Sequence, residues 1–246
     1  MNISIVIPCK NEAGIVNRLL ESLTKQTLLT DEVIIVDSNS TDTTVADALS
    51  FADRLPVKVI TATEKGVARA RNAGGREATG DMIIFADADT ILPPTFIQAA
   101  VAMANKGTIV GGFTARMDST KFSVRLGARV MNGYVRLMAK TPWPIAFTCL
   151  FSSKEAFTKL EGFDPLLFIM EDYDYILRAK RLGYKVGICT TPFLASDRRF
   201  KDDPLGTTWK GIYGELYRYT HGLRITKPLF RYDMGGKVKT QPNAQK

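Results

Sequence analysis

Four short apolar runs in the first 90 residues constrain the fold more than any other feature of the sequence. They are rich in β-branched residues and lack polar alternation, which is typical of parallel strands covered on both faces. An amphipathic helical pattern follows the first run, and polar segments with helix-capping residues follow the second. This alternation predicts an α/β fold with a Rossmann-like open sheet, mixed but mostly parallel, flanked by helices. The predicted strands are residues 3–8, 32–36, 57–61 and 82–86.

The second half of the chain is less regular but still alternates. Residues 109–113 predict a strand, and an apolar stripe then marks a helix. A proline-containing segment leads to another strand, followed by a short helix near 153–160, an acidic helix start and a last strand. The residues that mark the long helix are Phe122, Leu126, Val130, Tyr134, Leu137 and Met138.

Composition places the chain among ordinary globular proteins, with 45% apolar and 24% charged residues in a total of 246. The net charge of +8 is concentrated at the end, because residues 198–246 hold 11 Lys/Arg and 4 Asp/Glu. Such a tail could meet substrate phosphates, anionic lipid or nucleic acid, or it could be a solvated end. The irregular spacing of Cys9, Cys149 and Cys189 predicts buried thiols, and the lack of a leader or spanning segment predicts a cytoplasmic protein.

The carboxyl ends of the predicted strands should carry the functional site, because ligands of open parallel sheets bind there. Asp87 and Asp89 follow the fourth strand one residue apart. Two such carboxylates can share Mg²⁺ or Mn²⁺ together with substrate phosphates, and the cation can act as a Lewis acid. Further polar residues follow the strands at the same edge of the sheet, namely Asn11, Glu12, Asp37, Arg69 and Arg71.

A D-x-D pattern after a strand also begins the phosphatases that are similar to haloacid dehalogenases, in which Asp87 would be the nucleophile. Those proteins usually open with the D-x-D strand, whereas three predicted strand–helix units precede it here. The phosphatase interpretation would also leave Asn11, Asp37 and Arg71 without a role. We therefore keep it as the less favoured alternative.

Several ordered segments together resemble the family 2 glycosyltransferases, which have the GT-A fold and use nucleotide-diphospho-sugars. "SIVIPCKNEAGIVNRLLESLTKQT" is similar to the family's opening strand, loop and helix, and "EVIIVDSNSTDTT" to its second strand. "GVARARNAGGREATGDMIIFADADTILP" is similar to the stretch that leads through the D-x-D motif. "FSSKEAFTKLEGFDPLLFIMEDYDYILRAKRLGYKV" resembles the acceptor-side segment. The resemblance covers residues 3 to about 200.

The resemblance implies a role for each matched residue. Asp172 would be the base that deprotonates an acceptor hydroxyl, which gives inversion at the anomeric carbon, with Glu171 and Asp174 as alternatives. A Mn²⁺ or Mg²⁺ cofactor would be bound by Asp89 and Asp87, with His221 as a further candidate ligand. The diphosphate would be held by Arg199, or by its neighbour Arg198. The nucleotide would be bound by Pro8, Asn11, Glu12, Asp37, Arg69, Arg71, Asp87 and Arg199.

The resemblance also implies a domain organisation and partners. Residues 1–200 would form the GT-A-like domain, with a nucleotide-sugar half (about 1–115) and an acceptor half (about 116–200). Residues 201–246 would form a basic, partly helical extension, whose stripe (Trp209, Ile212, Tyr213, Leu216, Leu223) is core, a flap, or a contact with the inner face of the membrane. The partners would be a nucleotide-sugar donor and a saccharide or lipid-linked acceptor, without nucleic acid. The remaining alternatives are a retaining transferase and an inactive homologue that serves as a nucleotide-sugar sensor or a membrane-surface scaffold.

Overall fold

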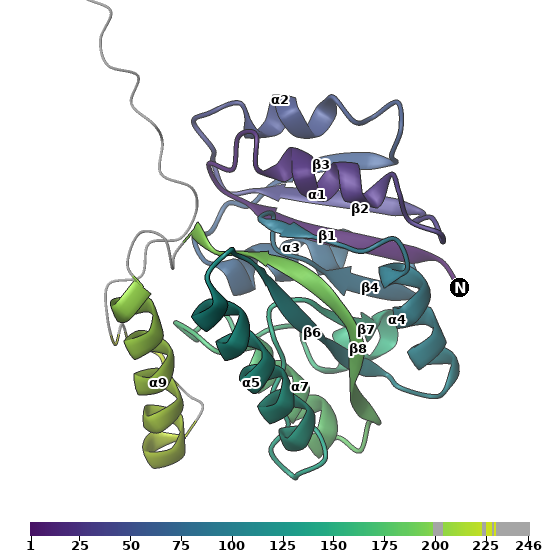
Figure 1. Cartoon of the computed structure of the whole chain (residues 1–246). Helices are drawn as coiled ribbons and strands as arrows, with labels where there is room; N and C mark the ends of the chain where they lie inside the picture. The colour runs from purple at the N-terminus through teal and green to yellow at the C-terminus, as the bar shows by residue number, and fades with distance from the viewer. Residues whose placement is uncertain (199–203, 223–224, 228, 230–246) are drawn as a thin grey trace, which may run out of the picture.

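The computed structural model describes residues 1–198, 204–222, 225–227 and 229 (Figure 1). Its helices are α1 Val16–Leu23, α2 Thr44–Leu49, α3 Val67–Glu77, α4 Phe96–Asn105, α5 Phe122–Met138, α6 Lys154–Lys159, α7 Glu171–Arg181 and α9 Pro204–His221. Its strands are β1 Ile3–Cys9, β2 Glu32–Asp37, β3 Val57–Thr61, β4 Met82–Phe85, β5 Thr90–Ile91, β6 Val110–Asp118, β7 Leu150–Ser153 and β8 Val186–Ser196.

The strands form one open sheet in the order β3-β2-β1-β4-β7-β6-β8-β5. The first four strands are parallel, as the sequence predicts. Strand β7 enters antiparallel between β4 and β6, and β5 pairs antiparallel with β8 at the edge. The prediction of a mixed, mostly parallel α/β sheet is therefore confirmed.

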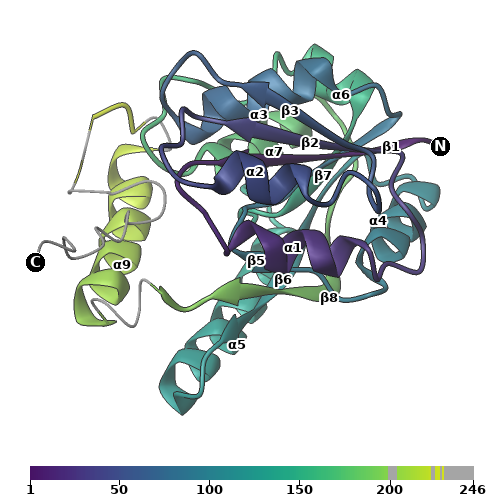
Figure 2. The ribbon, with the colours of Figure 1, turned by 90° about the horizontal axis from the view of Figure 1, so that it is seen from above.

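Helices cover both faces of the sheet (Figure 2), which explains why the strand sequences are apolar without alternation. Ile5 and Ile7 of β1 pack in one core with α1 and α4, and the intervening Val6 packs in a second core with α3, α6 and α7. The carboxyl ends of β1, β2 and β4 thus meet at one edge, held in place from both sides.

Helix α3 approaches the sheet and helix α6 more closely than a helix with side chains at every position could. A Cβ atom at Gly74 would lie 2.4 Å from Cγ1 of Val6 in β1, and one at Gly75 would lie 2.3 Å from Cζ of Phe157 in α6. We expect Gly75→Ala to lower the free energy of unfolding by about 1–3 kcal/mol through overpacking. Gly127→Ala in α5, where nothing lies within 4 Å, should instead raise it by up to about 1 kcal/mol. Urea unfolding of both variants checks this, and equal effects would contradict it.

The long helix predicted from the apolar stripe is present as α5, but most of that stripe faces solvent. Phe122, Leu126, Val130 and Leu137 are exposed, and Met138 is buried. On α9, the predicted stripe residues Trp209, Ile212, Tyr213 and Leu216 are also exposed, so the core interpretation is wrong for these four. Leu223 lies outside the described residues. Periodicity identifies residues that share a face but does not show what covers that face.

The three cysteines are free and buried, as predicted. Cys9 lies in β1, Cys149 immediately precedes β7, and Cys189 lies in β8. Within the described ranges, no helix combines the length and the apolar character needed to cross a membrane.

Candidate functional site

A cleft opens at the carboxyl ends of β1, β2 and β4, where the sequence predicts the site. It draws residues from the loops after these strands, from the start of α3, from the start of α7 and from the end of β8. Its lining residues are Pro8, Cys9, Lys10, Glu12, Ser38, Lys65, Gly66, Val67, Ala70, Arg71, Asp87, Ala88, Asp89, Thr148, Glu171 and Arg198.

Arg71 of α3 is the central charge of the cleft, and its side chain is 1% exposed. It donates from Nη2 to Asp87 Oδ1 at 2.8 Å and from Nη1 to Glu171 Oε1 at 2.6 Å. Burial opposes its charge, but the carboxylates of Asp87 and Glu171 outweigh burial and raise the pKa of Arg71 above its ordinary value. The carboxylate after β4 and the first residue of α7 are therefore joined through one permanent cation.

Arg198 contacts two further carboxylates of the cleft, those of Glu12 and Asp89. Its guanidinium group donates two hydrogen bonds of 2.7 Å to the Glu12 carboxylate, and Nη2 lies 3.1 Å from Asp89 Oδ2. These hydrogen bonds to the Glu12 carboxylate raise the pKa of Arg198. Arg199, the predicted diphosphate ligand, lies outside the described residues. Its sequence alternative, Arg198, lines the cleft.

The first turn of α7 carries three carboxylates, which face different surroundings. Glu171 points to Arg71, and Asp174 forms an ion pair with Arg178 at 2.6 Å. Asp172 is buried and accepts a hydrogen bond from the Tyr173 N–H at 2.9 Å. Burial, reinforced by the neighbouring Glu171 carboxylate, raises the pKa of Asp172 to about 8. The raised pKa means that the Asp172 carboxylate can take up a proton near neutral pH.

Asn11 and Asp37 organise the rim of the cleft without lining it. The Asn11 side chain accepts a hydrogen bond from the Thr41 N–H at 2.9 Å, and its backbone lies in the left-handed region at φ 52°. Asp37 ends β2 and accepts from the Ser40 N–H at 3.1 Å. The Asn11 bond joins the loops after β1 and β2, and the Asp37 bond fixes the loop after β2 to the end of its own strand. Pro8 and Glu12, from the same predicted set, do line the cleft.

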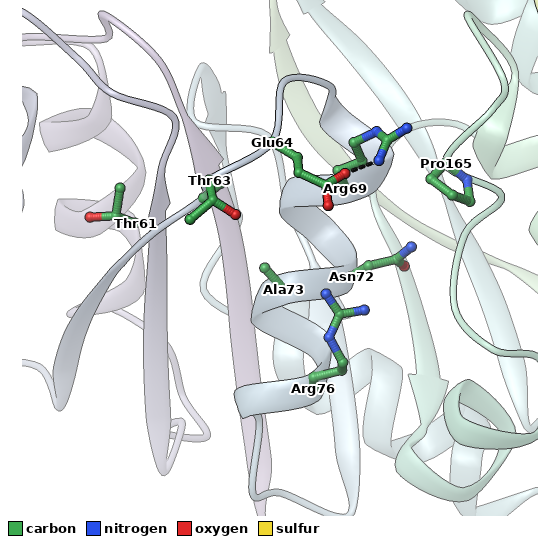
Figure 3. Close-up of a pocket in the computed structure, with 9 residues that line it drawn as sticks. Thr61, Thr63, Glu64, Arg69, Asn72, Ala73, Arg76 and Pro165 are labelled. Carbon is green, nitrogen blue, oxygen red and sulfur yellow. Dashed lines mark hydrogen bonds and ion pairs between the residues drawn. The ribbon is translucent and has the colours of Figure 1, made fainter.

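Arg69 points away from the cleft into a separate pocket beside α3 (Figure 3). There it pairs with Glu64, close to Asn72, Arg76 and Pro165. Residues two apart on a helix project to opposite sides, so Arg69 and Arg71 cannot enter the same site. The structure brings Arg71 alone of this pair to the cleft.

The candidate metal ligands are not brought together as one cluster. In the described part of the chain, no three His, Cys, Asp or Glu side chains gather closely enough to share a metal ion, so His221 does not join Asp87 and Asp89. The His221 ring stacks on Tyr217, with 4.2 Å between centroids, and is exposed. Two aspartates nevertheless fit Mg²⁺ or Mn²⁺, because such ions are commonly held by one or two carboxylates plus substrate phosphates and water.

Two lysines that line the cleft were not predicted from the sequence. Lys10 follows β1, and Lys65 precedes α3 next to Gly66, whose φ is 128°. Their position beyond strand ends was the available signal, but lysine in a loop is so common that position alone does not distinguish them. Together with Arg71 and Arg198 they give the cleft four cationic side chains.

Residues 4–158 match the family described as Glycosyl transferase family 2. The chain belongs to glycosyl transferase family 2. An uncharacterized glycosyltransferase of Haemophilus influenzae is 30% identical over 196 residues, which cover 72% of this chain and 61% of the relative. The chain spans between 23% and 61% of the length of this and two other curated relatives. Membership of the family removes the basis of the phosphatase alternative.

Solved structures show the same fold. A mannosyltransferase from Pyrobaculum calidifontis, in complex with GDP-Man and Mn²⁺, matches 79% of this chain and 56% of its own with a TM-score of 0.67 at 23% identity. Glucosyl-3-phosphoglycerate synthase from Mycobacterium tuberculosis, in complex with Mn²⁺, UDP and glucosyl-3-phosphoglycerate, matches 92% and 81% with a TM-score of 0.65 at 22% identity. The predicted GT-A-like fold of this family 2 member is confirmed.

Proposed function

We propose that this family 2 protein transfers a sugar from a nucleoside diphosphate to an acceptor hydroxyl group, with inversion at the anomeric carbon. The observation that carries the proposal is the position of Arg71, which links Asp87 to Glu171 within one cleft. A donor held at the strand ends and an acceptor near the start of α7 would then meet in the same space. The nucleotide complexes of the two similar structures support this choice of donor.

The cleft offers the charge that a diphosphate requires. Lys10, Lys65 and Arg198 line it, and the planar guanidinium group of Arg198 would bind phosphate oxygens in exchange for its bonds to Glu12 and Asp89. A divalent cation held by Asp89 and Asp87 would neutralise the negative charge of the leaving diphosphate. Arg71 would keep Asp87 oriented through its ion pair while the donor is bound.

Asp172 would act on the acceptor side as the general base. Its raised pKa, about 8, makes it a better proton acceptor than an ordinary aspartate when it is ionised. Glu171 adds a second negative charge, which favours proton uptake by Asp172. Asp174 is already paired with Arg178, and this pairing favours Asp172 over Asp174 for the role.

A panel of nucleoside diphosphates and their sugars, measured by thermal shift with and without Mn²⁺, tests the proposal. A ligand that binds only the native state raises the melting temperature by mass action, so the donor should give the largest shift and need the cation. The absence of any nucleotide-dependent shift would contradict the proposed function. The proton NMR spectrum of the product then separates inversion from the retaining alternative through its anomeric configuration.

Replacing Asp89 should weaken donor binding specifically in the presence of metal. We expect Asp89→Ala to lower the affinity for the nucleoside diphosphate by roughly tenfold or more with Mn²⁺ and much less without it. Isothermal titration measures both affinities. Asp118→Ala is the matched control, because Asp118 is exposed and pairs with Arg18 outside the cleft lining. Equal losses in the two variants would remove Asp89 from the metal site.

The acceptor is proposed only as a hydroxyl compound, either a saccharide or a lipid-linked molecule, and the site of action as the cytoplasm. The basic segment 201–246 is a further candidate for membrane contact, as the sequence suggests. Of this segment the structure describes α9 and four residues beyond Gly222, and α9 packs through Arg218 and Glu215 against Tyr134 of α5.

A further inference from the structure

Helix α5 turns an apolar stripe to solvent where a helix on a protein surface ordinarily presents polar side chains. Phe122 is 66% exposed, Val130 65% and Leu137 62%, and Leu126 between them is also exposed. Their spacing places them on one side of the helix. The opposite side is occupied, because Val135 and Met138 pack into a core with Tyr173. The exposed stripe is therefore a second apolar surface.

A row of arginines runs along this stripe. Arg125, Arg129 and Arg136 are exposed, and their spacing places them on one flank of α5. The 17 residues of the helix include no Asp or Glu. None of the three guanidinium groups has a carboxylate partner within the described ranges. We call this combination of apolar stripe and arginine row the α5 face.

Helix α9 lies beside α5 and exposes large apolar side chains of its own (Figure 1). Tyr134 Oη and Tyr219 Oη are 2.6 Å apart, and Arg218 donates to Tyr134 Oη at 2.9 Å, so the two helices are in direct contact. Trp209 and Ile212 are exposed on α9. Tryptophan and tyrosine are enriched where proteins meet the headgroup region of a membrane.

We propose that the α5 face docks on a membrane surface that contains anionic phospholipids. A helix with apolar side chains along one side and arginines beside them binds such a surface through burial at the headgroup boundary and through attraction to anionic lipid. A second copy of this chain fits less well, because a symmetric contact would set the unpaired arginines of two copies against each other. Nucleic acid would be attracted by the arginines but offers nothing to bury the apolar stripe.

The docking orientation has a consequence for the acceptor, which rests on the proposed function. Tyr173 packs against Val135 and Met138 on the inner side of α5, and Asp172 precedes it in the chain. The proposed base therefore lies on the inner side of α5, across this helix from the docking surface. A hydroxyl group carried on a lipid headgroup would then reach the acidic start of α7 around α5.

Cosedimentation with vesicles tests the arginine row in the full chain. Wild type should bind mixed phosphatidylglycerol–phosphatidylcholine vesicles and not phosphatidylcholine alone. Arg125→Gln/Arg129→Gln/Arg136→Gln should lower the partition coefficient on the order of 100-fold, since each cation near such a surface contributes about 1 kcal/mol. The control Lys58→Gln/Arg76→Gln/Lys159→Gln removes as many charges from β3, α3 and α6, far from α5 in Figure 2, and should retain binding within a few-fold.

A second pair of variants tests the apolar stripe. Phe122→Ser/Val130→Ser should lower the partition coefficient at unchanged charge, whereas Leu29→Ser, 67% exposed in the loop before β2, should not. Lack of wild-type binding, equal binding to neutral vesicles, or equal losses in the arginine variant and its control would overturn the proposal. A stable dimer in sedimentation that does not bind vesicles would assign the face to a second copy instead. None of these readouts depends on sugar transfer, so the proposed function can fail independently.

Discussion

Asp172→Asn is expected to abolish sugar transfer and at the same time to stabilise the protein at neutral pH. Removing a general base costs roughly 10²–10⁴-fold in kcat. The stability effect follows from the raised pKa of Asp172, about 8 in the native state. Between the ordinary aspartate pKa, near 4, and this value the native state holds a proton that the unfolded state releases, so stability falls as pH rises through that window. Asparagine cannot ionise, and the variant escapes this loss.

The measurements are kcat and urea unfolding of wild type and variant at several pH values between about 4 and 8. The rising limb of the wild-type pH–rate profile for kcat/KM should lie above the ordinary aspartate range, because the base acts only when ionised. Asp174→Asn is the matched control: it removes the ion pair with Arg178 on the same helix turn, so it should cost some stability and keep transfer. Full turnover of Asp172→Asn would exclude Asp172 as the base.

Arg71→Met is expected to be the most destabilising single change in the cleft. The substitution leaves Asp87 and Glu171 without their cation, and loss of one partner of a buried ion pair typically costs about 3–5 kcal/mol. Urea unfolding measures this loss. Arg69→Met, two residues earlier in the same helix, breaks the more exposed pair with Glu64 and should cost no more than about 1 kcal/mol.

A double variant separates the contribution of the Arg71 charge to stability from the contribution of its packing. Arg71→Met/Glu171→Gln removes the carboxylate that lies deepest beside the arginine, with its side chain 10% exposed against 28% for Asp87. We expect the double variant to recover part of the stability that Arg71→Met loses, because Asp87 can regain water. If the double variant is less stable than the single one, the arginine acts mainly through packing, for example on the Phe163 ring 5.4 Å away.

The parallel half of the fold is predictable because the sequence pattern of each strand depends on whether its two faces are buried. Residues 3–8 are apolar on both faces, and that pattern directly reflects burial on both sides of a sheet. The antiparallel position of β7 between β4 and β6 cannot be predicted in this way, because β7 has only four residues, Leu150–Ser153, and they show no pattern that indicates its partners. Strand order depends on contacts between distant segments, which composition and periodicity do not encode.

The site was predictable in its position more than in its contacts. Strand ends locate Asp87 and Asp89 in the cleft correctly, but the ion pair between Arg71 and Glu171 joins residues 100 positions apart. From local patterns, Arg69 and Arg71 were equally good candidates for the site. The orientation of α3 decides between them, because it directs only Arg71 into the cleft. The exposure of the α5 stripe was unpredictable for the same reason, because periodicity identifies the residues of one face and not what covers that face.

Two of the buried free thiols lie in different parts of one sheet, with Cys9 in β1 of the parallel half and Cys189 in β8 beyond β7. Cys9 is 2% exposed at the wall of the cleft and Cys189 is 6% exposed, so a thiol reagent reacts with either of them mainly when the surrounding structure opens. Their modification rates would therefore differ if the two halves of the sheet open separately and coincide if they open as one unit. The native cysteines can therefore be used, without an introduced label, to measure whether the sheet unfolds cooperatively.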